Sequence, residues 1–397
     1  MKRYLLSLTV LFAGWTAAWA QLGRYRADFA LSIHDFIDTV AIEWTRHQVA
    51  VPVDIDGHRY RFLLDTGAGQ TVIFSRSRLS TSLASTLIAH DATGRTDTVP
   101  VVTLPPLRIG HLTLSGCRAL VQQATGMQQF DGILGFDLVN GGLTMKIDVS
   151  ARRLILSDRS CLFCREPAHR LRYQLNYHVP YVEVTPFGRY RERVLFDTGS
   201  RQFYVINKNH FDDANYWRSQ GGYTVEGRSQ GSHAIGHFGT ETTGEVVFLQ
   251  LDNLRIGRYS FSHVHTLTTQ GGSHLGAMIL DYGAVSFCPR HRRMLFMPST
   301  AEQPCRVDNP QLEIAFVASP DGRPQVGLVW EQGIPYRQGL RQGDIITEID
   351  HRPVATLAQF ATWGFERGRE YVFTLVDPQG RRREVRWVRL PFQNENH

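Results

Sequence analysis

The 397-residue chain carries the same series of short segments twice, in the same order. Asp65-Thr66-Gly67 returns as Asp197-Thr198-Gly199, and each triplet follows an apolar run. Four further matches keep this order: Val51-Pro52 with Val179-Pro180, 108–110 with 255–257, 132–137 with 276–281, and 152–156 with 292–296. Any one match is compatible with chance, but five in the same order predict an internal duplication.

Both copies have the sequence signature of β-structure. β-Branched and aromatic residues alternate with polar ones, and glycine or proline interrupts them at short intervals, whereas helical periodicity is scarce. The chain is 42% hydrophobic and 20% charged, which is typical of a globular protein and excludes disordered and collagen-like chains. The sequence therefore predicts an all-β fold with two similar lobes.

Each Asp-Thr-Gly triplet places a carboxylate at the end of an apolar strand. Burial disfavours the charged form, so an isolated carboxylate there would be costly. If the lobes pack about a twofold axis, Asp65 and Asp197 meet and share one proton, so that one is an acid and the other a base. Such a pair can activate water and polarise a peptide carbonyl. One triplet alone is also a common turn sequence, but a matched pair at strand ends favours the paired site.

These segments resemble the aspartic peptidases. The stretch 62–73 is similar to a retropepsin catalytic segment, and 132–135 is similar to the apolar-apolar-glycine segment behind the catalytic loop. The resemblance, which spans residues 45–300, implies bilobed pepsin/retropepsin-like β-barrel lobes and an aspartic endopeptidase acting on a polypeptide substrate, with no metal and no cofactor. The implied catalytic residues are those of the two triplets: Asp65, Thr66, Gly67, Asp197, Thr198 and Gly199. Thr66 and Thr198 would cross-brace the two loops, and the protein would be a monomer with an internal pseudo-dimer.

One departure from the family pattern keeps an alternative open. In the match of 132–137 with 276–281, Ile279 stands where a second glycine is expected, and a bulky residue there would shift the support under Asp197. The alternative is a catalytically weak or inactive peptide-binding protein that uses the same cleft, the PDZ-like groove near the end of the chain, or both. A glycosidase using the two carboxylates is a third hypothesis, which the matched turns in a duplicated frame disfavour.

The two copies also differ beside the triplets. Ser200 follows the second triplet where Ala68 follows the first, and a hydroxyl bonded to a carboxylate favours its charged form. We therefore predict that Asp197 more often carries the negative charge and that Asp65 more often holds the shared proton. The glycine-bearing turns 90–95 and 231–237 are candidates for a hairpin that covers the cleft, although such turns equally mark ordinary loops.

The start of the chain is typical of a secretory signal peptide. Lys2 and Arg3 precede the apolar run 4–18, and small residues flank a cleavable bond before Gln21. This predicts an exported protein, periplasmic or secreted, with no membrane span after cleavage. The net charge is +6, but the arginines are scattered along the chain, so we expect no nucleic-acid partner.

Three smaller patterns invite functional interpretations that we do not favour. Five cysteines in an exported protein indicate one or two structural disulfides, rather than a redox or metal site at Cys161 and Cys164. The stretch 227–231 matches Gly-x-Ser-x-Gly but lacks the strand-to-helix context of a nucleophile elbow, so we expect a loop. His263 and His265 would share one strand face, which is favoured as a polar face over a metal site.

The composition changes near residue 300, which predicts a linker over 298–310 followed by a small domain. Within the stretch 308–390, residues 333–350 resemble the Gly-Leu-x-x-Gly-Asp turn and strand of bacterial PDZ domains. PDZ domains bind a peptide C-terminus by strand addition, but Glu313 in the matching loop would repel a carboxylate, so an intramolecular contact competes with peptide capture. The expected division is a signal peptide 1–20, an N-terminal lobe 21–165, a C-terminal lobe 166–300, and a linker with a small C-terminal PDZ-like domain 301–397.

Overall fold

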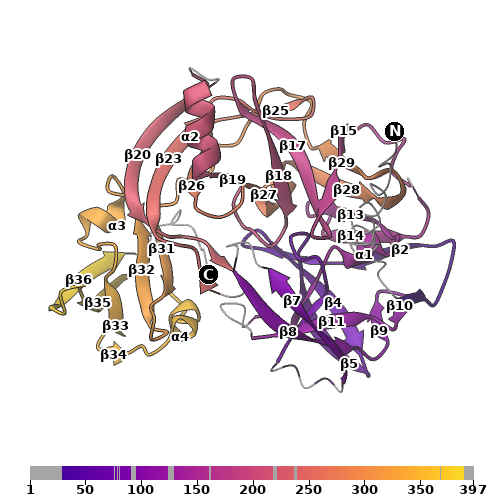
Figure 1. Ribbon diagram of the computed structural model, residues 1–397, viewed down its shortest axis with the longest axis horizontal. Coiled ribbons are helices and arrows are strands. Elements are labelled where there is room, and N and C mark those ends of the chain that lie inside the picture. The colour runs from indigo at the N-terminus through magenta and orange to yellow at the C-terminus, as the bar shows by residue number, and fades with distance from the viewer. Residues whose placement is uncertain are drawn as a thin grey trace, which may run out of the picture.

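The computed structural model describes residues 29–388, apart from 76, 78, 80, 91–94, 124–128, 161, 218–220, 237–238 and 367. The predicted signal peptide therefore lies outside the described residues. The described chain consists mostly of β-strands, which confirms the all-β part of the expected fold class (Figure 1). No helix among the described residues is long and apolar enough to cross a membrane.

Two large sheets have the same strand order. The first runs β1 (Ala30–Leu31), β10 (Leu112–Ser115), β9 (Leu107–Ile109), β4 (Gln48–Ile55), β5 (His58–Leu64), β12 (Gly132–Leu134), β6 (Val72–Phe74), β11 (Arg118–Gln122), β8 (Thr96–Thr103) and β7 (Ser82–His90). The second runs β30 (Cys305–Arg306), β25 (Tyr259–Ser262), β24 (Leu254–Ile256), β17 (Val179–Phe187), β18 (Tyr190–Asp197), β27 (His274–Gly276), β19 (Tyr204–Asn207), β26 (Val264–Thr269), β23 (Gly244–Leu251) and β20 (Tyr223–Gly231). β3 (Glu43–Thr45) pairs with β4 as β16 (Gln174–Asn176) pairs with β17, so the equivalence extends beyond the main path.

A third sheet joins the two halves of the chain. Its order is β15 (His169–Arg172), β29 (Arg293–Pro298), β28 (Gly283–Cys288), β13 (Thr144–Asp148), β14 (Arg153–Ser157) and β2 (Ile37–Ala41). The central strands β13 and β28 come from different halves, and Met145 and Ile147 pair with Phe287 and Val285. All four side chains are fully buried, so one apolar core continues from one half into the other. This order relates the halves by an approximate twofold axis between β13 and β28.

The strand pairing shows which residues of the two copies are equivalent. Phe62 and Val194 lie at the same distance before the aspartate of their own triplet, so they are equivalent. Phe62 pairs with Val51, and Val194 pairs with Val182. Val51 is therefore equivalent to Val182 and not to Val179, so the match of the two Val-Pro dipeptides was wrong by three residues. Both strands are apolar along much of their length, and a dipeptide is too short to set the register of such strands.

Two of the other matches are in register. Arg108 and Arg255 pair with equivalent positions of β4 and β17, and Arg153 and Arg293 pair with equivalent positions of β13 and β28. Arg152 precedes its strand in a left-handed conformation, as its counterpart in the second copy does. These matches succeed because a turn precedes or follows each strand, and turn geometry sets the register.

The helices are short, and most of them lie at strand ends. They are α1 (Asp137–Asn140), α2 (Lys208–Trp217), the 3₁₀ turns η1 (Ala277–Tyr282) and η2 (Pro289–His291), α3 (Ile334–Arg337) and α4 (Leu357–Ala361). Among the helices of the described residues, only α2 exceeds two turns, and it lies against β19, β23 and β26 of the second sheet. These short helices agree with the scarcity of helical periodicity in the sequence.

The C-terminal part of the chain has its own sheet and its own apolar core. The sheet consists of β31 (Ile314–Ala318), β32 (Pro324–Val329), β33 (Ile345–Ile349), β35 (Glu370–Val376) and β36 (Arg382–Val388), with β34 (Arg352–Pro353) paired to β33. Gly339 and Gly343 have φ angles of 104° and 89°, which require glycine in the turn before β33. Asp344 is buried beside them and is bonded by the Arg341 amide at 2.7 Å and by the Arg383 side chain.

The predicted linker 298–310 is packed against the second half rather than free. β30 adds in parallel to β25, and the Val307 amide donates to the Ser262 carbonyl at 3.0 Å. Cys305 and Val307 are buried in the main core. The polar and proline-rich composition indicated an irregular segment, but it did not reveal these few apolar anchors.

The structure also tests the predictions made from the cysteines, the 227–231 motif and the two histidines. Among the described cysteines no disulfide joins Cys117, Cys164, Cys288 and Cys305, and Cys161 lies outside the described residues. The expectation of a loop at 227–231 was wrong, because this stretch lies in β20. The histidines do not share a strand face: His263 is in a left-handed turn before β26, while His265 contacts Glu226 at 2.8 Å. The described residues contain no group of three or more side chains arranged to bind a metal.

Candidate active site

The two Asp-Thr-Gly triplets stand at the ends of equivalent strands. Asp65 follows β5, and its amide donates to the Leu134 carbonyl of β12 at 2.9 Å. Asp197 is the last residue of β18 and pairs with Gly276 at the end of β27. The residues before Asp65 are fully buried, as the apolar run predicted, so its carboxyl group rises from an apolar floor.

The structure brings the two triplets together. A Cβ atom on Gly67 would lie 2.6 Å from Asp197 Oδ1, and a Cβ atom on Gly199 would lie 2.5 Å from Asp65 Oδ2. Each glycine therefore makes room for the carboxyl group of the opposite copy, which no other residue could do without moving the loop. The predicted candidates Asp65, Gly67, Asp197 and Gly199 thus form one site.

The two threonines brace the loops beneath the carboxyl groups. The amides of Thr66 and Thr198 each donate to the hydroxyl of the other threonine at 3.0 Å. The Thr66 hydroxyl donates to the Phe196 carbonyl and the Thr198 hydroxyl to the Leu64 carbonyl, each at 2.7 Å. Both side chains are buried, so these four bonds form without competition from water. The reciprocal pattern holds the two loops in a fixed relative position.

The two carboxyl groups are held by backbone amides and lie close enough to affect each other. Within each loop, Gly67 donates its amide to Asp65 Oδ1 and Gly199 donates its amide to Asp197 Oδ1, both at 2.8 Å. The Asp197 carboxyl group also interacts with that of Asp65, and two carboxyl groups this close can share one proton. Burial, followed by the charge of Asp197, raises the pKa of Asp65 well above its usual value. The pair can therefore present an acid and a base at the same pH.

The predicted role of Ser200 differs from what the structure shows. The Ser200 hydroxyl accepts a hydrogen bond from the Gln202 amide at 3.4 Å, whereas it is the Ser200 amide that approaches Asp197 Oδ1, at 3.3 Å. Since Ala68 offers the same backbone donor to Asp65, the hydroxyl does not create the expected asymmetry. The raised pKa of Asp65 instead follows from its burial.

Glycines behind the two loops support them equally. A Cβ atom on Gly135 would lie 2.8 Å from the Ala68 carbonyl, and one on Gly276 would lie 2.8 Å from the Ser200 carbonyl. The next amide along, Phe136 or Ala277, donates to the same carbonyl at 2.7 Å.

Gly276 is therefore the counterpart of Gly135, and the match of 132–137 with 276–281 was wrong by three residues. Ile279 does not replace a glycine. It is fully buried in η1, beyond the support for Asp197. The mistake arose because Gly-Ala-Met-Ile resembles the Gly-Ile-Leu-Gly segment in apolar character, while the true counterpart begins with the polar Ser273 and His274.

Two groups near the site carry no signal that marked them in the sequence. Asp137 is buried and accepts hydrogen bonds from the Thr71 amide at 3.0 Å and the Thr71 hydroxyl at 3.1 Å. Tyr181 lies opposite Leu195 in the paired strands, which places it on the same face as Asp197. Burial and then the charge of Asp197 raise the pKa of Tyr181. Strand alternation would have placed Tyr181 on this face once the register was known.

The two predicted flap turns lie in equivalent hairpins. Turn 90–95 connects β7 with β8, and 91–94 lie outside the described residues. Turn 231–237 lies in the connection from β20 to β23, where β21 (Ile235–Gly236) pairs with β22 (Gly239–Thr240). A Cβ atom on Gly239 would lie 2.8 Å from a guanidinium nitrogen of Arg95, so the two hairpins approach each other.

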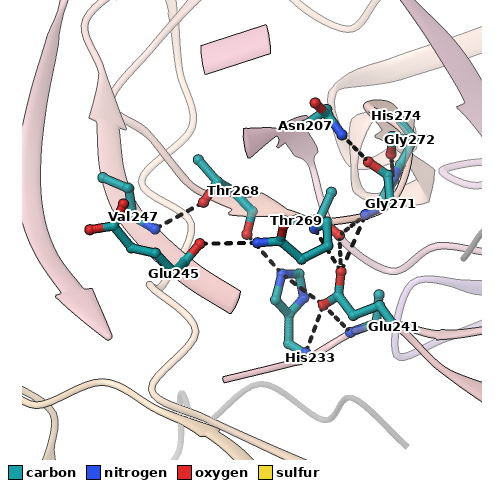
Figure 2. A network of polar contacts seen from close by, with 12 residues as sticks. Asn207, His233, Glu241, Glu245, Val247, Thr268, Thr269, Gly271, Gly272 and His274 are labelled. Carbon is teal, nitrogen blue, oxygen red and sulfur yellow. Dashed lines mark hydrogen bonds and ion pairs between the residues drawn. The ribbon is translucent and has the colours of Figure 1, made fainter. Parts of the chain in front are cut away.

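A buried carboxylate holds the second of these hairpins. Glu241 accepts hydrogen bonds from the amides of His233, Ala234 and Gln270 at 2.8–2.9 Å, and from the Thr269 hydroxyl (Figure 2). Burial raises the pKa of Glu241, but His233 and the hydrogen bonds outweigh it and hold the pKa below its usual value. Glu241 therefore remains charged and fastens the hairpin to the loop after β26.

A comparison with known proteins matches the part of the chain that contains the first triplet. Residues 51–138 match the family model described as Aspartyl protease. The matched stretch begins in β4, contains Asp65, Thr66 and Gly67, and ends in α1, so it covers the strands that position the first triplet. No curated protein matches the chain. The family match supports an aspartyl protease function for this chain.

Proposed function

We propose that the protein is an aspartic endopeptidase. The observation that carries this proposal is the close approach of the Asp65 and Asp197 carboxyl groups, which two equivalent loops present above a threonine brace. A turn sequence without catalytic purpose would not need a glycine in each loop to admit the other loop's carboxyl group. The family match over 51–138 independently supports the same function.

The proposed reaction uses the two carboxyl groups in opposite protonation states. Ionised Asp197 accepts a proton from water as the water oxygen attacks the peptide carbonyl carbon, and Asp65 donates its proton to the carbonyl oxygen. The tetrahedral intermediate then collapses as the C–N bond breaks. Asp197 returns its proton to the leaving nitrogen, and Asp65 regains one from the hydroxyl oxygen. Because the two groups titrate together, their pH dependence belongs to the pair.

We also propose a specific fold, a division into domains and a location for the protein. The matched strand orders and the sheet that joins the halves support a bilobed pepsin- or retropepsin-like fold derived by duplication. We assign residues 1–20 to a signal peptide, 21–165 and 166–300 to the two lobes, and 301–397 to a linker and a PDZ-like domain. Export to the periplasm or the medium follows from the signal peptide.

The alternative of a catalytically weak peptide-binding protein loses its main support. It rested on Ile279, whereas Gly276 supplies the backbone support under Asp197. For the PDZ-like domain, Glu313 favours an intramolecular role over capture of a peptide terminus. Its side chain accepts a hydrogen bond from the Ile334 amide at 3.2 Å, so it is already bound within the C-terminal part of the chain.

Cleavage of a peptide library from acidic to neutral pH tests the proposal. We expect cleavage by the wild type and loss of it in both Asp65→Asn and Asp197→Asn, because either change removes the shared-proton pair. Asp213→Asn, an exposed aspartate on α2, is the matched control and should retain full activity. Cleavage that survives either substitution in the dyad contradicts the mechanism, and a wild type inactive at every pH favours the peptide-binding alternative.

A further inference from the structure

The Gly-x-Ser-x-Gly motif of β20 forms a contact surface for the C-terminal sheet. Alternate residues of a strand share one face, so Gly227, Ser229 and Gly231 point the same way. A Cβ atom on Gly227 would lie 2.6 Å from Trp330 Nε1, and one on Gly231 would overlap the Gly327 carbonyl of β32. The small residues therefore let β32 approach the backbone of β20, and Figure 1 shows the C-terminal sheet beside β20 and β23.

Apolar side chains extend this contact beyond β20. Trp330 packs on Phe248 of β23, with ring centroids 5.7 Å apart. One buried cluster combines residues from both sides of the contact: Val246, Phe248 and Leu267 from the second half, and Leu312, Ala315, Leu328 and Trp330 from the C-terminal part. Since this cluster is separate from the core of the C-terminal sheet, it belongs to the contact itself.

The contact continues into the hairpin that follows β20. The Ser232 amide donates to the Gly327 carbonyl at 2.9 Å, and a Cβ atom on Gly327 would lie 2.5 Å from the Ser232 carbonyl. On its other side the same segment is held by Glu241, which joins His233 and Ala234 to the loop after β26 (Figure 2). The hairpin is thus attached at two places, once to each neighbouring part of the molecule.

We propose that the C-terminal domain clamps the second hairpin in place and thereby raises the affinity for the peptide substrate. The substrate part of this inference rests on the proposed peptidase function. Gly239 of this hairpin approaches Arg95 of the first hairpin, so the two hairpins predicted as covers of the cleft lie together. A hairpin already held in place loses less conformational entropy when it closes on a peptide, so the clamp acts mainly on KM.

The clamp is tested with two variants of the contact and one of the second anchor. Gly231→Ala forces β20 away from β32, and Trp330→Ala removes the apolar contact without adding bulk. Glu241→Gln weakens the other anchor of the same hairpin. Gly272→Ala is the matched control, because a Cβ atom there meets nothing within 4 Å.

Hydrogen exchange at residues 232–236 and 239–241 is the first measurement, because it requires no catalysis. We expect the amides of this segment to exchange at least ~10-fold faster in Gly231→Ala, Trp330→Ala and Glu241→Gln than in the wild type, the equivalent of about 1.4 kcal/mol. The control should match the wild type. Unchanged exchange in both Gly231→Ala and Trp330→Ala overturns the clamp. Faster exchange throughout the second half would indicate general unfolding and would also contradict it.

Steady-state kinetics on a cleaved peptide is the second measurement. We expect KM to rise by about 10-fold in Gly231→Ala and Trp330→Ala with little change in kcat, because the dyad is untouched. Faster local exchange with an unchanged KM refutes the role in substrate affinity. If the wild type cleaves no peptide, the peptidase proposal fails, and the exchange result still decides whether the domain clamps the hairpin.

Discussion

Replacing Asp137 by asparagine is expected to stabilise the protein at neutral pH. Asp137 is buried, and its hydrogen-bond donors are the amide and hydroxyl of Thr71. Burial raises its pKa from 3.8 to about 6 despite these bonds. The second copy shows that the position tolerates a neutral side chain, because the residue equivalent to Asp137 is Met278, which is buried.

The magnitude follows from the difference in pKa between the folded and unfolded states. The folded state holds the proton more tightly, so stability is highest below pH 3.8 and falls as the pH rises to about 6. A shift of about 2 units corresponds to about 3 kcal/mol. Asparagine cannot ionise, and its amide can pair with the Thr71 amide and hydroxyl. The variant should therefore gain about 3 kcal/mol on the wild type between pH 3.5 and pH 7.

Thermal unfolding at several pH values measures this gain. About 3 kcal/mol corresponds to a rise of roughly 6–12 °C in the midpoint of a unit of 150–250 residues. Asp213→Asn, which changes an exposed aspartate, controls for the loss of one negative charge and should show no such trend. A difference between wild type and Asp137→Asn that is constant with pH, or that shrinks from pH 3.5 to pH 7, would refute the assignment of a raised pKa to Asp137.

Three further predictions follow from the site and its surroundings. Gly67→Ala and Gly199→Ala should each lower kcat by at least about 100-fold, because the added methyl group displaces the opposite carboxyl group; steady-state kinetics on a peptide substrate measures this loss. His210 has a raised pKa, first because of its hydrogen bond to Glu192. Its contribution to stability is therefore complete below pH 6.5 and disappears as the pH rises through the raised value, so His210→Ala should destabilise the protein at pH 6 and not at pH 9. Burial and the charge of Asp137 raise the pKa of the Cys117 thiol to about 12, so this thiol should resist alkylation at pH 8 until the protein unfolds.

The sequence predicts the elements that depend on strong local signals. Apolar alternation indicated the strands, and the paired triplets indicated which carboxyl groups would meet. What it could not predict were contacts made by ordinary residues far apart in the chain. Glu241 has no motif around it, and its donors come from two separate loops. Gly227 and Gly231 matched the pattern of a nucleophile elbow instead. Their role in the structure depends on the approach of β32, which no local pattern reveals.

A final prediction concerns the alignment of the two copies behind Asp197. Sequence similarity places Ile279 at the glycine position, whereas the structure places Gly276 there. If Ile279 occupied a glycine position, Ile279→Gly would restore the family pattern and raise activity. The structure instead places Ile279 in the buried core, so this change should cost about 3–5 kcal/mol of stability and add no activity. Gly276→Ala should instead inactivate the enzyme, because the methyl group would press on the Ser200 and Gln202 carbonyls directly behind Asp197. Gly135→Ala serves as the reference, since it places the same strain behind Asp65 and should cause a similar loss of kcat. A gain of activity in Ile279→Gly, or a fully active Gly276→Ala, would show that the two copies align as the sequence alone suggests.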